Sequence, residues 1–237
     1  MLRWLTTLLR PGRADAALTL AALAGLALCS PAQADADADA APAPAPLDDE
    51  SLAEWDHFEL SMGFLAGQRR YGDLRWSGTQ GLPAGALEGA PFDAPVPALG
   101  LRYDVRLVVA YVRMTAGVDV PFTAYDVEDT RRTLADGREL SITELKPFSL
   151  RFGIGGELPV GPVAPFLDLL GSIDFTRATL ELDGDAHELE ARSFGFALRA
   201  GARLHVREWF FATASAEVGL VGTTRWGAEL SVGFALM

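Results

Sequence analysis

The sequence predicts an all-β protein, an eight-stranded antiparallel up-and-down transmembrane β-barrel. Several segments of about ten residues alternate apolar and polar side chains with a period of two, which is the length and pattern that a tilted membrane-spanning strand requires. The connections between these segments alternate between short and long. The C-terminal segment, residues 226–236, shows the alternation most clearly, with Trp226 to Leu236 apolar at every second position and small or polar residues between them.

Eight segments show this alternation of apolar and polar residues. They are residues 56–67, 98–107, 110–122, 147–157, 163–176, 192–206, 209–220 and 226–236. Taken at every second residue, the apolar faces of the first four run from Phe58 to Ala66, Leu99 to Val105, Val112 to Phe122 and Phe148 to Ile154. Those of the last four run from Leu167 to Phe175, Phe194 to Val206, Phe210 to Val218 and Trp226 to Leu236. The fifth segment is the least regular, because Leu170 falls on its polar face.

The connections support a barrel that crosses a bacterial outer membrane. Tight turns are expected around residues 108–109, 159–162 and 207–208, and long loops over residues 68–97, 123–146 and 177–191, whereas the connection near 221–225 is short. Short turns at one end and longer loops at the other are typical of such barrels, with the short turns on the periplasmic side.

Two of the long loops contain hairpin signals. Asp136-Gly137 and Asp183-Gly184 each lie between strand-like flanks, so both loops are expected to continue as paired strands beyond the membrane. The loop 68–97 contains Gly and Pro throughout and is expected to be irregular.

The polar face decides which side of the barrel points outward. A soluble barrel covers its exterior with long charged side chains, yet this face is mostly Gly, Ser, Thr and Ala, and Lys146 is the only lysine of the chain. Small residues with a few Arg and Glu suit the crowded interior of an eight-stranded barrel. The alternative is a soluble lipocalin-like barrel that binds an apolar ligand in a cavity lined by aromatic residues, namely Phe58, Phe194, Phe196 and Phe234.

The N-terminal residues are expected to be a signal peptide and a tail. Residues 1–34 have a basic start, a small-apolar run over 16–28 and the small-x-small sequence Ala32-Gln33-Ala34, which predicts export and cleavage after Ala34. Cys29 weakly resembles a lipoprotein box. Residues 35–55 are rich in Ala, Pro and Asp and are expected to form a solvated periplasmic tail. Residues 56–237 form the predicted barrel domain.

Composition excludes several classes of function. Residues 1–34 contain three of the 20 basic and one of the 32 acidic residues, so the remainder has a formal net charge of −14 and no cysteine. Nucleic acid is not an expected partner, because phosphate binding needs clustered positive charge. No cofactor-binding or metal-binding spacing is present, so neither a cofactor nor a metal is expected.

Charged residues on the polar faces are expected to pair inside the barrel, because an isolated buried charge costs several kcal/mol. Counting from the short turns predicts one cluster of Arg199, Glu217 and Glu229. The same count predicts that Asp104 approaches Arg113 and that Arg151 approaches Asp168. These seven residues form the predicted interior charge network, and its expected role is structural.

Aromatic residues near the strand ends are expected to anchor the barrel at the membrane interfaces. Those predicted on the periplasmic side are Trp55, Tyr111, Trp209 and Phe210, and those on the outer side are Trp226, Phe122 and Phe148.

Together these features resemble the small eight-stranded outer-membrane family typified by the OmpA and OmpX transmembrane domains. The resemblance covers residues 56–237 and rests on architecture. Two features depart from the family. Its members usually end in an aromatic residue that the assembly machinery reads, whereas Met237 is last here. OmpA-like proteins often carry a peptidoglycan-binding domain after the barrel, and this chain stops at the eighth strand.

The resemblance implies the outer membrane of a Gram-negative bacterium, with membrane lipid, lipopolysaccharide and the barrel-assembly machinery as partners. The expected function is a structural or surface-interaction role, with a plugged polar interior and protruding outer hairpins. One alternative is a narrow porin-like conduit for small or apolar solutes, and the lipocalin-like barrel is another. A lipid A-modifying enzyme would need a base near a Ser and an acid. His57 and His205 map to the periplasmic half and His187 lacks a nearby Ser, so no enzyme is expected.

Overall fold

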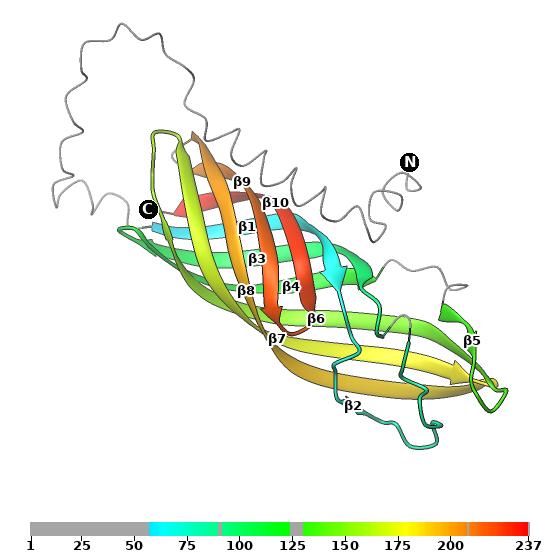
Figure 1. Cartoon of the computed structure of the whole chain (residues 1–237). Helices are drawn as coiled ribbons and strands as arrows, with labels where there is room; N and C mark the ends of the chain where they lie inside the picture. Colours follow the sequence, from blue (N-terminus) through cyan, green and yellow to red (C-terminus); the bar gives the residue numbers. More distant parts are fainter. Residues whose placement is uncertain (1–56, 90–91, 124–129, 208, 237) are drawn as a thin grey trace, which may run out of the picture. The chain divides into compact units, whose positions relative to one another are not determined.

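The computed structural model describes residues 57–89, 92–123, 130–207 and 209–236, and within them it contains ten β-strands (Figure 1). The strands are β1 (His57–Arg69), β2 (Trp76–Ser77), β3 (Val96–Val109), β4 (Val112–Thr123), β5 (Arg132–Thr133), β6 (Glu139–Glu157), β7 (Val163–Leu182), β8 (Asp185–Arg207), β9 (Phe210–Val221) and β10 (Thr224–Leu236). The predicted signal peptide and tail, and Trp55, lie outside the described residues. In the part of the chain that is described, no helix has the length and hydropathy needed to cross a membrane.

Eight of these strands form a closed ring. Each long strand pairs antiparallel with the one that follows it, in the order β1, β3, β4, β6, β7, β8, β9 and β10, and β10 pairs back onto β1. Closure matters because an open sheet edge would leave backbone N–H and C=O groups without partners. The predicted fold class, an eight-stranded antiparallel up-and-down barrel, is therefore confirmed.

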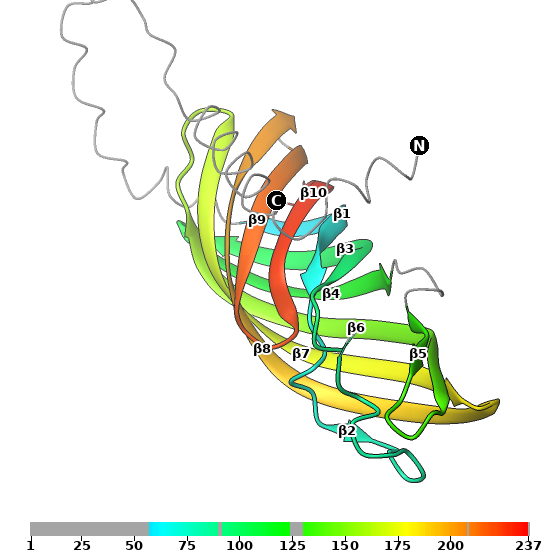
Figure 2. The ribbon, with the colours of Figure 1, turned by 45° about the vertical axis from the view of Figure 1, so that its right-hand side comes forward.

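The predicted strands match the observed ones, with one systematic difference. β6, β7 and β8 are 19, 20 and 23 residues long, against the 12 to 14 residues of the other five barrel strands. Figures 1 and 2 show β6, β7 and β8 extending together past the ends of their neighbours, with β2 and β5 beside them. The predicted extended hairpins are present, since Asp183-Gly184 joins β7 to β8 and Asp136-Gly137 lies between β5 and β6.

The tight connections define one end of the barrel, the turn end, and the longer ones define the loop end. The first turn is displaced from the predicted residues 108–109 to Ala110-Tyr111, because Val109 still pairs with Val112 across it. Ala110 adopts a φ of 52°, the left-handed conformation that a two-residue hairpin turn requires. At the loop end, β9 and β10 are joined by the short turn at Gly222-Thr223, as predicted.

The apolar faces point outward and the polar faces point inward. Phe64, Phe194 and Leu230 are 73 %, 70 % and 70 % exposed. The four aromatic residues of the lipocalin-like alternative are likewise on the outside, since Phe58, Phe194, Phe196 and Phe234 are all exposed. That alternative is therefore wrong about the interior: a barrel whose aromatic residues face out has no apolar ligand cavity between them.

The polarity of the faces reverses where β6, β7 and β8 leave the ring. Along the inward face of β7, Asp168 and Asp174 are buried charges, whereas Leu180 farther along is a fully buried apolar residue. Along its outward face, Phe175 is the last apolar residue before the exposed Arg177. An apolar exterior with a polar interior suits lipid, and a polar exterior with an apolar interior suits water, so the reversal indicates where the barrel leaves the hydrocarbon.

Candidate functional site

The barrel interior is filled with ionised side chains. Among the described residues, seven arginines and eight carboxylates are buried, all of them on inward positions of the barrel strands. The arginines are Arg69, Arg102, Arg106, Arg113, Arg151, Arg199 and Arg203, and the carboxylates are Glu59, Asp104, Asp119, Glu157, Asp168, Asp174, Glu217 and Glu229. We call them the interior network. Nearly equal numbers of opposite charges make such burial tolerable, because each ion needs a partner when water is excluded.

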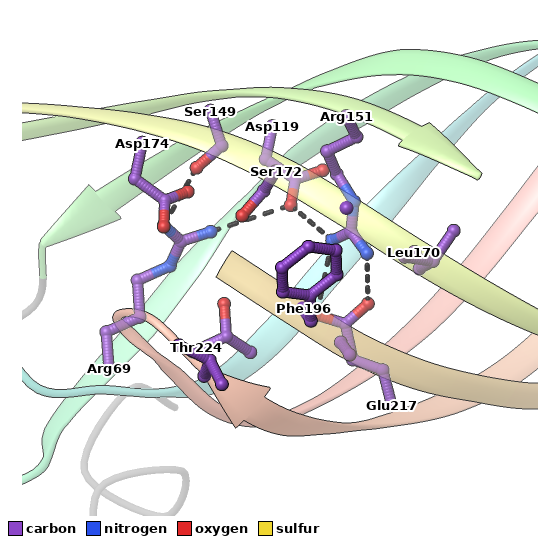
Figure 3. Close-up of a pocket in the computed structure, with 13 residues that line it drawn as sticks. Arg69, Asp119, Ser149, Arg151, Leu170, Ser172, Asp174, Phe196, Glu217 and Thr224 are labelled. Atoms are coloured by element: carbon purple, nitrogen blue, oxygen red, sulfur yellow. Dashed lines mark hydrogen bonds and ion pairs between the residues drawn. The ribbon is translucent and has the colours of Figure 1, made fainter. Parts of the chain in front are cut away.

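Arg102 is the central residue in the half of the interior network that lies nearest the loop end. Its Nε and Nη2 donate to the two oxygens of Asp119 at 2.7 and 2.9 Å, the paired geometry that suits a guanidinium and a carboxylate. Its Nη1 donates to Glu229 at 3.0 Å, and its Nη2 lies 3.0 Å from Glu217. Arg151 lies between the same acids, 2.7 Å from Asp119 and 2.8 Å from Glu217 (Figure 3).

Arg199 occupies the middle of the interior. Its guanidinium contacts Asp168 at 2.8 Å, Asp104 at 3.0 Å and Glu229 at 3.4 Å. Glu229 therefore connects Arg199 with Arg102, and through Arg102 with Glu217. The three residues predicted to cluster, Arg199, Glu217 and Glu229, lie in one connected network, although Glu217 is bound by Arg102 and Arg151.

At the turn end of the interior, further ion pairs join the network through Arg113, which lies 3.5 Å from Asp168. Glu157 lies 3.0 Å from Arg203 and 3.4 Å from Arg113. Glu59 is paired with Arg203 and lies 2.8 Å from the Nε2 of His57. Arg113 also stacks on the Phe166 ring, 3.8 Å from its centre. These contacts continue the network to the turn end, so that charged side chains fill the barrel over most of its height.

Two predicted pairs are wrong, each because of strand register. Asp104 faces Gly117 of β4, four residues from Arg113, and it binds Arg106 and Arg199 instead. Four residues along a strand span about 13 Å, more than the two side chains can bridge.

The predicted pairing of Arg151 with Asp168 is also wrong by four residues. Asp168 faces Gly155 of β6, four residues from Arg151, and it contacts Arg199 and Arg113. Counting residues from the turns ignored the stagger between strands of a tilted barrel, which moves partners along one another.

Glycine provides the space for these carboxylates. A Cβ on Gly117 would collide with the Asp104 carboxylate and the Tyr103 carbonyl oxygen, and one on Gly155 would collide with the Asp168 carboxylate and the Leu167 carbonyl oxygen. Each glycine thus faces an inward carboxylate on the neighbouring strand. The small residues of the polar faces, which the sequence shows, leave room for the longer ones.

Among the described residues, the space left between these side chains near the loop end is too small for a channel. A cavity of about 10 Å³ lies near the loop end, lined by residues that include Arg69, Ser149, Asp174 and Thr224 (Figure 3). This is room for about one water molecule. Arg69 extends across it toward Ser149, which accepts a hydrogen bond from Nη1 at 3.0 Å.

An apolar cap closes the loop end above the network. Its sheet consists of the extended parts of β6, β7 and β8, with β5 paired to β6 and β2 paired to β8. The inward face of this sheet packs against the connection between β1 and β3. The buried cluster comprises Tyr71, Phe92, Val96, Leu140, Ile142, Leu145, Ala178, Leu180, Leu182 and Leu189, and Leu74, Trp76, Leu82, Leu87 and Leu134 pack partly buried against it.

The cap meets the network at Asp174 and Thr223. Thr223, in the turn between β9 and β10, is buried and donates a hydrogen bond to Asp174 at 3.1 Å, and its carbonyl oxygen accepts one from the Arg70 N–H at 2.8 Å. Next to them, burial raises the pKa of Tyr71 to about 12, so its phenol stays neutral within the cap. The interior is thus closed by ion pairs and, at the loop end, also by apolar packing.

Most of the predicted aromatic residues that are described lie at or near the strand ends, and Phe148 lies within β6. Tyr111 lies in the first turn, and Trp209 and Phe210 lie at the β8–β9 turn. Trp209 stacks on Phe234 with ring centres 5.9 Å apart and planes 2° apart. Trp226 lies near the start of β10 at the loop end. Phe122 lies at the loop end of β4, whereas Phe148 lies in the middle of the longer β6, where its outward apolar face ends, and both are exposed.

The three histidines lie at opposite ends of the barrel. His57 is buried and bound to Glu59, and it lies at the turn end with His205, which packs 6.2 Å from the Phe211 ring centre. His187 lies in the hairpin of β7 and β8 at the opposite end. Among the described residues no group of three or more His, Cys, Asp or Glu side chains is arranged to hold a metal ion.

No protein-family model matches the sequence, and no curated protein matches it. Among solved structures, the chain is similar to neisserial surface protein A, at 14 % identity and a TM-score of 0.46, over 76 % of this chain and 96 % of that one. It is also similar to Ail, the attachment invasion locus protein of Yersinia pestis, at 12 % identity and a TM-score of 0.46, over 77 % of this chain and 99 % of that one. A third similar structure is the N-terminal β-barrel domain of Pseudomonas aeruginosa OprF, at 14 % identity and a TM-score of 0.40, over 76 % of this chain and 97 % of that one.

The fold assignment rests on the chain itself: eight strands paired in a ring, an exposed apolar exterior and a buried charged interior. By these features the chain is an eight-stranded antiparallel up-and-down β-barrel of the transmembrane kind.

Proposed function

We propose that this chain is an outer-membrane protein of a Gram-negative bacterium with a non-enzymatic structural or surface-interaction role, performed by the sheet that projects beyond the membrane. The observation that carries the proposal is the combination of a closed interior with an ordered cap at one end. A barrel whose lumen is filled offers its surroundings only two surfaces, the apolar belt and the projecting cap.

The interior supports this role over that of a conduit. Ion pairs join strands that are not neighbours in the ring, and so cross the lumen at successive heights: Arg151 with Glu217, Arg199 with Asp104, and Arg203 with Glu59. The apolar cap adds a second barrier of a different kind. Moving a solute through would require breaking buried ion pairs, which costs several kcal/mol for each uncompensated charge.

The partners follow from the same two surfaces. The apolar belt suits outer-membrane lipid and the lipid chains of lipopolysaccharide, and insertion would depend on the barrel-assembly machinery. The projecting sheet turns a polar face to the medium, with exposed Glu139 and Glu181 on neighbouring strands. Such a face suits contact with polar surfaces of other molecules.

Two measurements test the proposal. First, the membrane fraction is run on a denaturing gel with and without boiling, and a folded barrel is expected to migrate faster when unboiled. A soluble protein without a mobility shift would contradict the proposal. Second, the refolded protein is placed in a planar lipid bilayer, where no large, steady single-channel conductance is expected. A steady open channel would instead favour the conduit.

A further inference from the structure

A row of three cations lies on the outer surface of the barrel, directly beyond the apolar belt at the loop end. On β6, β7 and β8 the last outward apolar residues are Phe148, Phe175 and Phe194. The next outward residue on each strand is a cation, and all three are exposed: Lys146, Arg177 and Arg192. We call these three residues the cation row.

The register of the strands places these cations close together. Lys146 on β6 pairs directly with Arg177 on β7, and Arg192 on β8 pairs with Phe175, one outward position below Arg177. Directly paired residues have Cβ atoms about 5 Å apart, and diagonal neighbours about 7–8 Å apart. The Arg192 guanidinium lies over the Phe175 ring, 5.6 Å from its centre, which holds it against the edge of the belt.

Stability does not account for this arrangement. Like charges placed opposite each other on neighbouring strands are destabilising, and Lys146 and Arg177 are such a pair. Their side chains are 68 % and 77 % exposed, so neither is used for packing. The only lysine of the chain is thus placed opposite an arginine at the boundary of the belt.

The acids near the row lie level with it or on its far side from the belt: Glu190 is directly opposite Arg177, and Glu144 lies farther out than Lys146. Lys146 is paired with Glu144, and Arg177 with Glu190 at 2.9 Å. Glu144 and Glu190 each lie two residues farther from the belt than Lys146 and Arg192 on the same strands. Ion pairs this exposed contribute little and exchange readily. An anion that approaches from the lipid side therefore meets Arg192 first, and then Lys146 and Arg177 with Glu190 beside them.

We infer that the cation row binds the phosphate groups of an anionic lipid headgroup in the outer leaflet. This inference rests on the proposed membrane function and specifies one of its partners. The apolar belt holds the lipid chains next to Phe148, Phe175 and Phe194, and this contact brings the headgroup to the height of the row. Cations next to a membrane surface each favour anionic lipid by about 1 kcal/mol.

The test uses the full chain folded in detergent and titrated with bisphosphorylated lipid A, with bound lipid counted by native mass spectrometry. The variant K146Q/R177Q/R192Q is expected to bind at least about tenfold more weakly, because three such contacts are lost. The matched control R75Q/R138Q/R225Q removes three exposed arginines that lie elsewhere in the part of the chain beyond the belt, and its affinity is expected to match that of the unchanged protein. Equal affinity of the two triple variants would overturn the inference.

A second variant, which is expected to bind lipid A more tightly, tests the inference independently. The variant E144Q/E190Q frees Lys146 and Arg177 and is expected to bind lipid A more tightly, a result that misfolding would not produce. Dephosphorylated lipid A should not distinguish any of the variants, and a difference that persisted with it would overturn the role of phosphate. Gel mobility of each variant reports folding separately. If the variants keep the gel mobility of the unchanged protein and also bind lipid A equally well, the inference is refuted but the proposed function is not. If the unchanged protein fails to insert into membranes, the proposed function is refuted.

Discussion

At the scale of single residues, Arg102 shows how the interior is held. One guanidinium contacts three carboxylates from three strands, Asp119 on β4, Glu217 on β9 and Glu229 on β10. Each contact satisfies a charge that would be costly in isolation. The sequence places these residues on inward faces, but it does not identify Arg102 as the centre of the network, because that depends on side chains from opposite walls of the barrel.

Arg102→Met tests this role. Removing the guanidinium leaves three buried carboxylates with fewer partners, and a loss of about 3–5 kcal/mol in the free energy of unfolding is expected. The measurement is urea unfolding of the protein in phosphatidylcholine vesicles, followed by tryptophan fluorescence. Arg138→Met is the control, because Arg138 and its partner Asp136 are 38 % and 41 % exposed, and it should change stability by no more than about 0.5 kcal/mol. Equal unfolding midpoints for the two variants would contradict the role of Arg102.

At the scale of elements, the extensions of β6, β7 and β8 form a second structural unit, in which the inward face is apolar and the outward face is polar. Inside the belt their inward residues include the charged Arg151, Asp168 and Arg199, and beyond it the buried inward residues are mainly Leu, Ile and Ala. The connection between β1 and β3 covers this apolar face, with Tyr71 and Phe92 both 1 % exposed. The cap is therefore stabilised by hydrophobic burial, and the barrel below it by strand pairing and ion pairs.

Leu180→Ala tests the separate stability of the cap. Leu180 is fully buried, and its truncation is expected to cost about 2–5 kcal/mol. The loss should loosen the cap without opening the barrel. Trypsin is expected to cut near Arg75 faster, while the unboiled protein keeps its gel mobility. Thr179→Ala, one residue away and on the outward face, serves as the control and should leave the cutting rate unchanged. Simultaneous loss of the mobility shift would show that cap and barrel unfold as one unit.

At the scale of the whole molecule, the polarity reversal sets how deep the barrel lies in the membrane. The belt ends at Phe148, Phe175 and Phe194 on the three longest strands, and these residues are followed by the cation row. The Phe148 and Phe175 rings lie 6.2 Å apart. An aromatic border followed by cations is the arrangement expected at a membrane interface. Residues beyond the border are then expected to lie in water.

Two arginine substitutions on the outward face of β7 test this depth. Leu169→Arg places a charge within the belt and is expected to cost about 2–4 kcal/mol, because arginine is unfavourable near the middle of the bilayer. Thr179→Arg places the same charge beyond the belt and is expected to have little effect. The measurement is the yield of the fast-migrating folded form after refolding into vesicles. Comparable yields for the two variants would show that the belt has been placed wrongly.

Much of this architecture could be predicted from local sequence. The alternation from Trp226 to Leu236 predicts β10 closely, and the two Asp-Gly pairs predict the hairpins beyond the belt. The pairs Asp104 with Arg113 and Arg151 with Asp168 could not be predicted in the same way. Counting from the turns measures position along one strand, whereas partners depend on the stagger between strands.

The sequence by itself determined the number of barrel strands and the face that each of their residues occupies, because these follow from a period of two in the chain. The tertiary structure decided which charges meet and what covers the extensions. Arg102 finds its three partners only once the ring has closed, and Leu180 is buried only once residues 70–89 fold across it. Contacts across a closed barrel join residues more than 100 positions apart, such as Arg102 and Glu229, and no local pattern records them.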